Sequence, residues 1–196
     1  PLMYDLYPGS IVDVSTLHNT LEKLPALGVT GSTLIMDRGF CSGTNLTAQA
    51  EKQISFIMPA SRIFKAVKQA LSKIRRTIAR SQNLHLFKEK TVFVEPVELM
   101  IEGIQFSGYG YYSPQREQDE RERFYRKLRE TIDYLESIEL KPYLKPKQVV
   151  EKHAGIYAPY LSWKTADNRL HITVREKAVT QRVHKMGLTI LLYQGK

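Results

Sequence analysis

An aspartate that follows a short apolar segment is the residue best placed to do chemistry. The segment from Ser32 to Met36 (STLIM) predicts a buried strand, and Asp37 comes directly after it. Ligands of open α/β sheets bind outside the carboxyl ends of the strands, so a carboxylate there can hold Mg²⁺, which prefers oxygen ligands. Arg38 keeps the site polar, and Gly39 lets a metal or another backbone approach closely. The alternative is that Asp37 caps the loop or helix that follows.

Lys and Arg are concentrated in parts of the chain that favour a polyanionic partner. The 196 residues carry a formal net charge of +9, and residues 61–90 hold nine Lys and Arg against one acid. Residues 140–163 contribute +3 and residues 164–196 contribute +5. Neutralisation of phosphates with release of counterions is the main sequence-independent term in nucleic-acid binding. The charge therefore favours nucleic acid, with a solvated basic helix as the alternative; no lipid anchor follows the basic segment to support a membrane.

Other catalytic patterns are missing from the sequence. There is no GxGxxG, no glycine-rich phosphate loop ending in Lys-Ser/Thr and no serine nucleophile elbow. The histidines lack the spacing of metal ligands: His18, His85, His153, His171 and His184. Cys41 has no neighbouring histidine to activate it, so we interpret it as a small packing residue. The tyrosines of GYGYYS (108–113) can stack on bases, but a loop that packs on its own domain is the favoured interpretation.

Composition indicates one soluble domain, with or without an appendage. The chain is 42% hydrophobic and 25% charged, which excludes collagen-like and disordered classes. Its single cysteine excludes an internal disulfide, as in cytosolic proteins. No segment approaches the roughly 18 apolar residues of a membrane-spanning helix, and the first residues lack a signal-peptide pattern. We therefore expect a cytoplasmic protein.

The elements around Asp37 predict an α/β core. A strand before the Pro8-Gly9 turn, a helix from residue 15 or 16 to 27, and the strand at 32–36 precede Asp37. A short helix at 45–52 and a buried strand at 54–58 follow it. This alternation of strands and helices is typical of an α/β sheet.

After Pro59 the pattern predicts a basic α+β region. Residues 61–81 show a helical apolar stripe, and 91–114 alternate weakly, as strands ending in a Gly/Tyr-rich loop. A long amphipathic helix is predicted at 115–138, and 141–147 (KPYLKPK) reads as a connector. Three further strands are predicted, at residues 157–163, 170–174 and 188–193.

Three segments of the chain belong together by their order and spacing: PLMYDLYPGSIVDVSTL, LIMDRGFCSGTNL and ISFIMPA, which begin at residues 1, 34 and 54. Together they resemble the catalytic domain of insertion-sequence transposases of the DDE type, in the IS-four-like group. In that group P-G-N-x-x-D precedes a helix, and D-R-G-F/Y ends a strand of a ribonuclease-H-like sheet; Ser10 replaces the usual Asn here. NRLHITVREKAV (168–179) and KMGLTILLYQG (185–195) resemble the insertion region and the strand that returns to the core.

The resemblance implies an α/β fold with an incomplete ribonuclease-H-like mixed-sheet core and an α+β insertion. We expect residues 1–59 in the core, 60–185 in the basic insertion and 186–196 in the returning strand. It also implies DNA phosphoryl transfer by two Mg²⁺ (or Mn²⁺) ions held by two aspartates and one glutamate. Asp37 matches the second aspartate and is the expected catalytic residue and metal ligand. The first aspartate is expected before Pro1 and the glutamate beyond Lys196, so the chain alone is expected to be an inactive fragment.

The resemblance implies double-stranded DNA as the partner, both transposon ends and target, at the nucleoid of a prokaryotic cytoplasm; a homodimer is compatible with it. The residues expected to contact DNA phosphates are the cations of the basic helix: Arg62, Lys65, Lys68, Lys73, Arg75, Arg76 and Arg80. Two alternatives remain open, a DNA-binding transposase remnant without catalysis and another metal-dependent nuclease of the same fold.

Overall fold

The chain forms two compact units in the computed structural model, which describes residues 23, 28 and 33–195. Unit 1 comprises residues 1–113 and 188–196, and unit 2 comprises residues 114–187. The strand and helix predicted before residue 28 lie outside the described residues. The boundary predicted after residue 59 falls inside unit 1, and the chain leaves and re-enters this unit at 113/114 and 187/188 instead.

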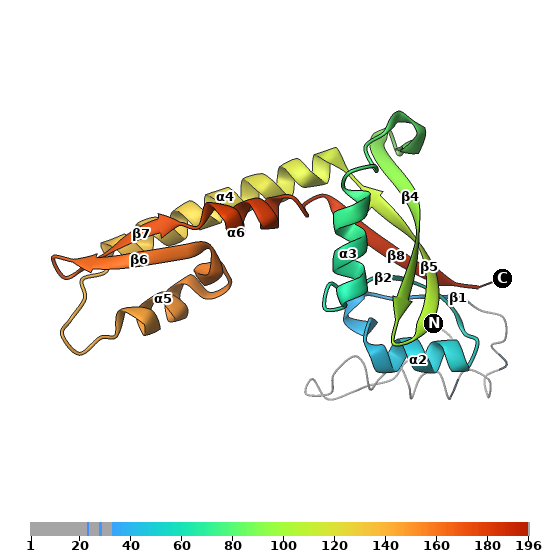
Figure 1. Ribbon diagram of the computed structural model, residues 1–196, viewed down its shortest axis with the longest axis horizontal. Helices are drawn as coiled ribbons and strands as arrows, with labels where there is room; N and C mark the ends of the chain where they lie inside the picture. The colour runs from blue at the N-terminus through green and yellow to red at the C-terminus, as the bar shows by residue number, and fades with distance from the viewer. Residues whose placement is uncertain (1–22, 24–27, 29–32, 196) are drawn as a thin grey trace. The chain divides into compact units, whose positions relative to one another are not determined.

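Unit 1 is built on a six-stranded mixed sheet with the strand order β1-β2-β8-β5-β4-β3 (Figure 1). The strands β1 and β2 are parallel, and the other neighbouring pairs are antiparallel. Their bounds are β1 (Thr33–Ile35), β2 (Ser55–Pro59), β3 (Leu84–Phe87), β4 (Lys90–Ile101), β5 (Ile104–Tyr112) and β8 (Leu188–Gln194). The last strand returns from far along the chain to lie between β2 and β5. The α/β class with a mixed sheet is thus confirmed.

The core of unit 1 lies between one face of this sheet and the helices α2 (Gly43–Glu51) and α3 (Lys65–Ile74). Alternate residues of β8, namely Leu188, Ile190 and Leu192, are buried on this face, as the strand period of two requires. The α3 helix buries Val67, Leu71 and Ile74 at intervals of four and three. The helix predicted at 61–81 is shorter in the structure: α3 begins only at Lys65, and residues 75–79 form turns after it.

The tyrosine-rich segment at 108–112 is part of β5, so the predicted loop is wrong. Two glycines explain the error, since glycines usually mark turns in a sequence. A Cβ on Gly108 would lie 2.6 Å from the Leu191 carbonyl oxygen of β8, and one on Gly110 would lie 2.5 Å from Cδ1 of Ile74. The glycines therefore let the neighbouring strand and α3 approach β5 closely.

Unit 2 surrounds a separate core with helices and a two-stranded sheet. The long helix α4 (Pro114–Ser137) buries Phe124, Leu128, Ile132 and Leu135, the stripe that the sequence predicts. Its exposed side is stabilised by i,i+4 ion pairs such as Arg129–Asp133 at 2.7 Å. The other elements are α5 (Pro146–Ala154), the 3-10 helix η4 (Gly155–Tyr160), β6 (Leu161–Ala166), β7 (Arg169–Val174) and α6 (Glu176–Val183).

The strands β6 and β7 pair as an antiparallel hairpin. Asp167 and Asn168 have φ of 50° and 55°, the left-handed conformation that two-residue hairpin turns require. The strand predicted from residue 157 begins only at Leu161, because the preceding residues form η4. The helices α5 and α6 were not predicted. None of the helices in the described ranges is long and apolar enough to cross a membrane.

Candidate functional site

Asp37 lies at the carboxyl end of β1, where the sequence predicts it. The Met36 N–H donates to the Ile57 carbonyl oxygen at 3.0 Å, so the pairing with β2 extends to the residue before Asp37. The Asp37 side chain is exposed and caps the short 3-10 helix η2 (Arg38–Phe40). Its Oδ1 accepts a hydrogen bond from the Gly39 N–H at 2.7 Å. The capping role is therefore observed, and it uses only one of the two carboxylate oxygens.

Asp37 offers a carboxylate that a divalent metal could use. Within the described ranges, no three His, Cys, Asp or Glu side chains lie close enough together to hold a metal ion. Mg²⁺ is usually bound by one or two carboxylates together with phosphate oxygens and water. The described residues therefore do not gather three such side chains around Asp37.

Cys41 is buried next to this end of β1, as its predicted packing role requires. Its Sγ accepts a hydrogen bond from the Ser61 N–H at 3.2 Å. Burial raises the pKa of the Cys41 thiol, and the bond from Ser61 and the charge of Arg38 offset this only in part. A nucleophilic cysteine needs a lowered pKa, so this thiol is not activated.

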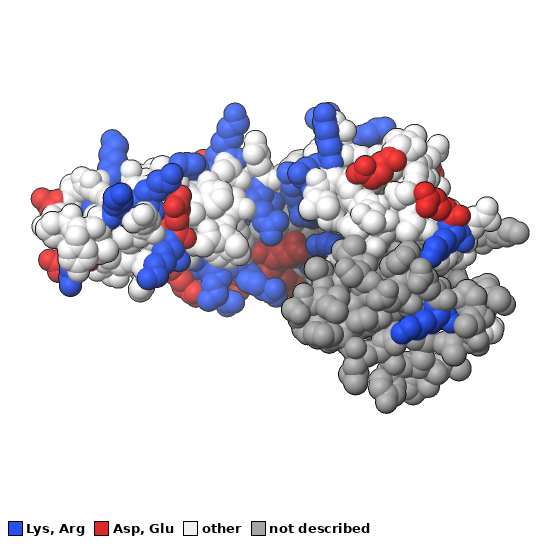
Figure 2. All heavy atoms as spheres, turned by 90° about the horizontal axis from the view of Figure 1, so that it is seen from below, with Lys and Arg blue, Asp and Glu red and all other residues white. Residues whose placement is uncertain are grey.

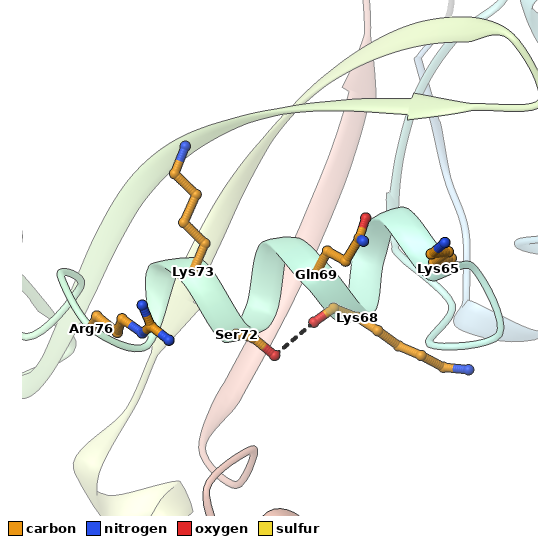
Figure 3. Close-up of a pocket in the computed structure, with 6 residues that line it drawn as sticks. All are labelled: Lys65, Lys68, Gln69, Ser72, Lys73 and Arg76. Atoms are coloured by element: carbon orange, nitrogen blue, oxygen red, sulfur yellow. Dashed lines mark hydrogen bonds between the residues drawn. The ribbon is translucent and has the colours of Figure 1, made fainter.

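The exposed side of α3 carries a row of polar side chains (Figure 3). Six of them line a shallow hollow of about 430 Å³: Lys65, Lys68, Gln69, Ser72, Lys73 and Arg76. They are spaced by one, three or four residues so that all fall on one side of the helix, opposite the buried stripe. The helix itself contains no Asp or Glu. The face is thus uniformly cationic, with two hydrogen-bonding side chains, Gln69 and Ser72, among its cations.

Two of the seven predicted DNA-binding cations make contacts inside unit 1. The Nη2 group of Arg62 donates to the Leu188 carbonyl oxygen at 2.8 Å and ties the segment before α3 to β8. The guanidinium of Arg75 lies over the Tyr112 ring of β5, 4.9 Å from its centroid. Both side chains are half-buried. The other five are exposed: Lys65, Lys68, Lys73, Arg76 and Arg80.

A polar cluster fixes the turns that follow α3 to β4. The Thr77 hydroxyl donates to the Glu95 carboxylate at 2.8 Å, and the Asn83 amide donates to the same carboxylate at 3.3 Å. The Asn83 amide also donates to the Ile78 carbonyl oxygen at 3.2 Å. Since Arg76 is next to Thr77, these bonds hold the end of the cationic face on a rigid strand.

Sequence reasoning missed Gln69 and Ser72, which complete the face. Neither residue is charged, and a search based on net charge passes over them. The spacing of the cations could have identified these two residues. Positions 69 and 72 fall between Lys65, Lys68, Lys73 and Arg76 on the same side of the helix.

A family model described as "Transposase DDE domain" matches residues 1–156. The chain belongs to this transposase family. The family implies an enzyme that cleaves and transfers DNA, with DNA as its partner and, in general, divalent metals as its cofactors. Neither a curated protein nor a solved structure matches the chain significantly. The residues that match the transposase family include Asp37 and the whole cationic face.

Proposed function

We propose that this chain is part of an IS-four-like insertion-sequence transposase and binds transposon-end DNA through the exposed face of α3. The observation that carries the proposal is a row of four exposed cations: Lys65, Lys68 and Lys73 on a helix without acids, and Arg76 in the turn that follows it. In this proposal unit 1 is an incomplete ribonuclease-H-like core, and unit 2 is the insertion that interrupts it. The protein would act in the cytoplasm of a prokaryotic cell.

The dimensions of the face suit a phosphate backbone. Within α3 the span from Lys65 to Lys73 is about 12 Å at a rise of roughly 1.5 Å per residue. A DNA strand advances about 3.4 Å per phosphate, so the face can meet several successive phosphates. Lysine ammonium groups act as compact point charges, and the amide of Gln69 can donate to phosphate oxygens as well. The Ser72 hydroxyl already donates to the Lys68 carbonyl oxygen at 3.0 Å (Figure 3). Phosphate contacts position DNA without reading its sequence.

Asp37 is proposed as one ligand of the catalytic metal, Mg²⁺ or Mn²⁺. When bound, two such ions activate the attacking oxygen and stabilise the leaving oxygen of a phosphoryl transfer. The chain's own contribution is to hold the Asp37 carboxylate at the end of β1 through the bond to the Gly39 N–H. Since losing members of a catalytic unit costs orders of magnitude in rate, the 196-residue chain alone is proposed to be inactive.

The salt dependence of duplex binding tests the proposed role of α3. We expect K65Q/K68Q/K73Q to lower the slope of log Kobs against log[salt] by about 2.7, at roughly 0.9 for each phosphate that is no longer neutralised. The matched control K52Q/K88Q/K90Q removes three exposed lysines outside α3. It should leave the slope within about 0.5 of the wild type. An equal reduction of the slope in both variants would show that the charge acts diffusely and that α3 is not the binding face.

A binding protein without catalysis is the second candidate, because Asp37 already has a structural partner in Gly39. A cleavage assay on duplex DNA with Mg²⁺ or Mn²⁺ separates the two candidates. Metal-dependent cleavage by the 196-residue chain that is abolished in Asp37→Ala would contradict both this candidate and the proposed inactivity.

A further inference from the structure

The hairpin of β6 and β7 presents two chemically different faces. Its inner face packs into the core of unit 2, with Leu161 and Leu170 buried and Trp163, Ile172 and Val174 partly buried against them. The opposite face follows from the register of the pairs 162↔173, 164↔171 and 166↔169. It consists of small, polar and basic side chains: Ser162, Lys164, Ala166, Arg169, His171 and Thr173.

The outer face is cationic and exposed. Lys164, Arg169, His171 and Thr173 are exposed, and neither strand contains an Asp or Glu. The exposed Glu139 forms an isolated antiparallel bridge with Arg169 at the edge of β7. Lys and Arg side chains project, among Asp and Glu, from the side of unit 2 seen in Figure 2. In the register of the two strands Lys164 lies opposite His171, and Arg169 lies opposite Ala166. The charge of this face therefore complements a polyanion.

The hairpin is held rigidly on its unit. The Ile172 N–H donates to Oε1 of Glu136 in α4 at 3.0 Å. The Leu140 N–H donates to the Asn168 carbonyl oxygen in the turn at 2.7 Å, and the Arg175 N–H donates to the Tyr160 carbonyl oxygen at 2.8 Å. Both ends of the two-stranded ribbon are thus anchored. A rigid surface loses little conformational entropy when it binds a partner.

We propose that the outer face of the β6–β7 ribbon inserts into the major groove of duplex DNA. The major groove is about 12 Å wide and admits a two-stranded ribbon, whose strands lie about 4.8 Å apart. Lys164 and Arg169 bind phosphates at the groove walls. His171 and Thr173 face the base edges, where an imidazole can donate or accept and a threonine can donate, accept or contact a thymine methyl. This inference rests on the proposed function, because it assigns a second binding surface to the same DNA partner.

Two measurements on the full chain test the ribbon, with a mixed-sequence 30-base-pair duplex as the probe. The variant K164Q/R169Q/H171Q changes only exposed side chains, and its circular dichroism should match that of the wild type. We expect its slope of log Kobs against log[salt] to fall by about 1.8, because two phosphates are no longer neutralised. The control K141Q/K145Q removes two exposed lysines of unit 2 outside the ribbon and should leave the slope unchanged.

Displacement of methyl green, a dye bound in the major groove, locates the binding surface. At saturating protein, the wild type and K65Q/K68Q/K73Q should displace the dye, whereas K164Q/R169Q/H171Q should bind the duplex and leave the dye in place. Undiminished displacement by the ribbon variant overturns the inference. The proposed role of α3 is tested independently of the ribbon. It is wrong if K65Q/K68Q/K73Q keeps the wild-type slope of log Kobs against log[salt] while K164Q/R169Q/H171Q shows its expected decrease.

Discussion

Replacing Arg62 and Arg75 should separate stability from DNA binding within one basic segment. Both arginines belong to the cation-rich segment that the sequence assigns to DNA, but their guanidinium groups contact Leu188 and Tyr112 of unit 1. The perturbation is R62M/R75M, which keeps much of each apolar stem and removes each guanidinium. The comparison is K65Q/K73Q, which removes two exposed charges from α3.

The interactions of these two arginines set the size of the expected effect. A hydrogen bond from a charged group contributes about 1.5–3 kcal/mol, and the half-buried position of Arg62 places it at the lower end. A guanidinium over an aromatic ring contributes about 0.5–1 kcal/mol at an exposed site and more when it is desolvated, so half-buried Arg75 over Tyr112 should contribute at least this much. R62M/R75M should therefore lower the free energy of unfolding by about 2 kcal/mol. K65Q/K73Q should change it by less than about 0.5 kcal/mol.

Urea unfolding and fluorescence anisotropy of a labelled duplex measure the two effects. We expect R62M/R75M to shift the unfolding midpoint and to change the slope of log Kobs against log[salt] by less than about 0.5, whereas K65Q/K73Q lowers that slope by about 1.8. The reasoning is refuted if R62M/R75M lowers the slope as much as K65Q/K73Q does at temperatures where it is folded. That result would mean that the guanidinium groups leave Leu188 and Tyr112 to meet DNA.

Three further predictions concern single residues of unit 1. Asp37→Asn keeps an acceptor for the Gly39 N–H and should change the unfolding midpoint little, whereas Asp37→Ala should cost about 1 kcal/mol; chemical denaturation compares them. Gly108→Ala should cost about 1–3 kcal/mol, because the added Cβ meets the fixed backbone of β8, and a midpoint equal to the wild type would argue against the observed register. The raised pKa of the Cys41 thiol means that the folded state favours the protonated thiol. The thiol therefore contributes fully to the free energy of unfolding below the pKa that it has in the unfolded chain. This contribution is lost as pH rises through the pKa of the folded state. The free energy of unfolding should therefore fall less steeply in alkaline solution for Cys41→Ala than for the wild type.

The position of Asp37 follows from local sequence, because a short apolar strand, a polar residue and a small-residue loop are neighbours in the chain. The helix and strand that follow were predicted within two residues for the same reason. The α4 helix was predicted from its own stripe of Phe124, Leu128, Ile132 and Leu135. These elements share a signal that lies within one stretch of sequence.

Features that depend on distant parts of the chain were not predicted. Gly108 and Gly110 form a strand only because β8 and α3 approach them from elsewhere in the sequence. The internal roles of Arg62 and Arg75 likewise depend on Leu188 and Tyr112, which no local pattern indicates. The short helix α6 buries only two valines, too few to give a clear period before the core of unit 2 is known.

Photocrosslinking from the centre of the cationic face tests the central claim most directly. Gln69 lies among the cations of α3 and is itself uncharged, so a photoreactive benzoylphenylalanine at this position keeps every cation. Gln118, an exposed residue of α4, provides the matched control. The account predicts a crosslink to duplex DNA from position 69, weakened by salt, and much less from position 118. No crosslink from position 69 under conditions where the duplex is bound would contradict it.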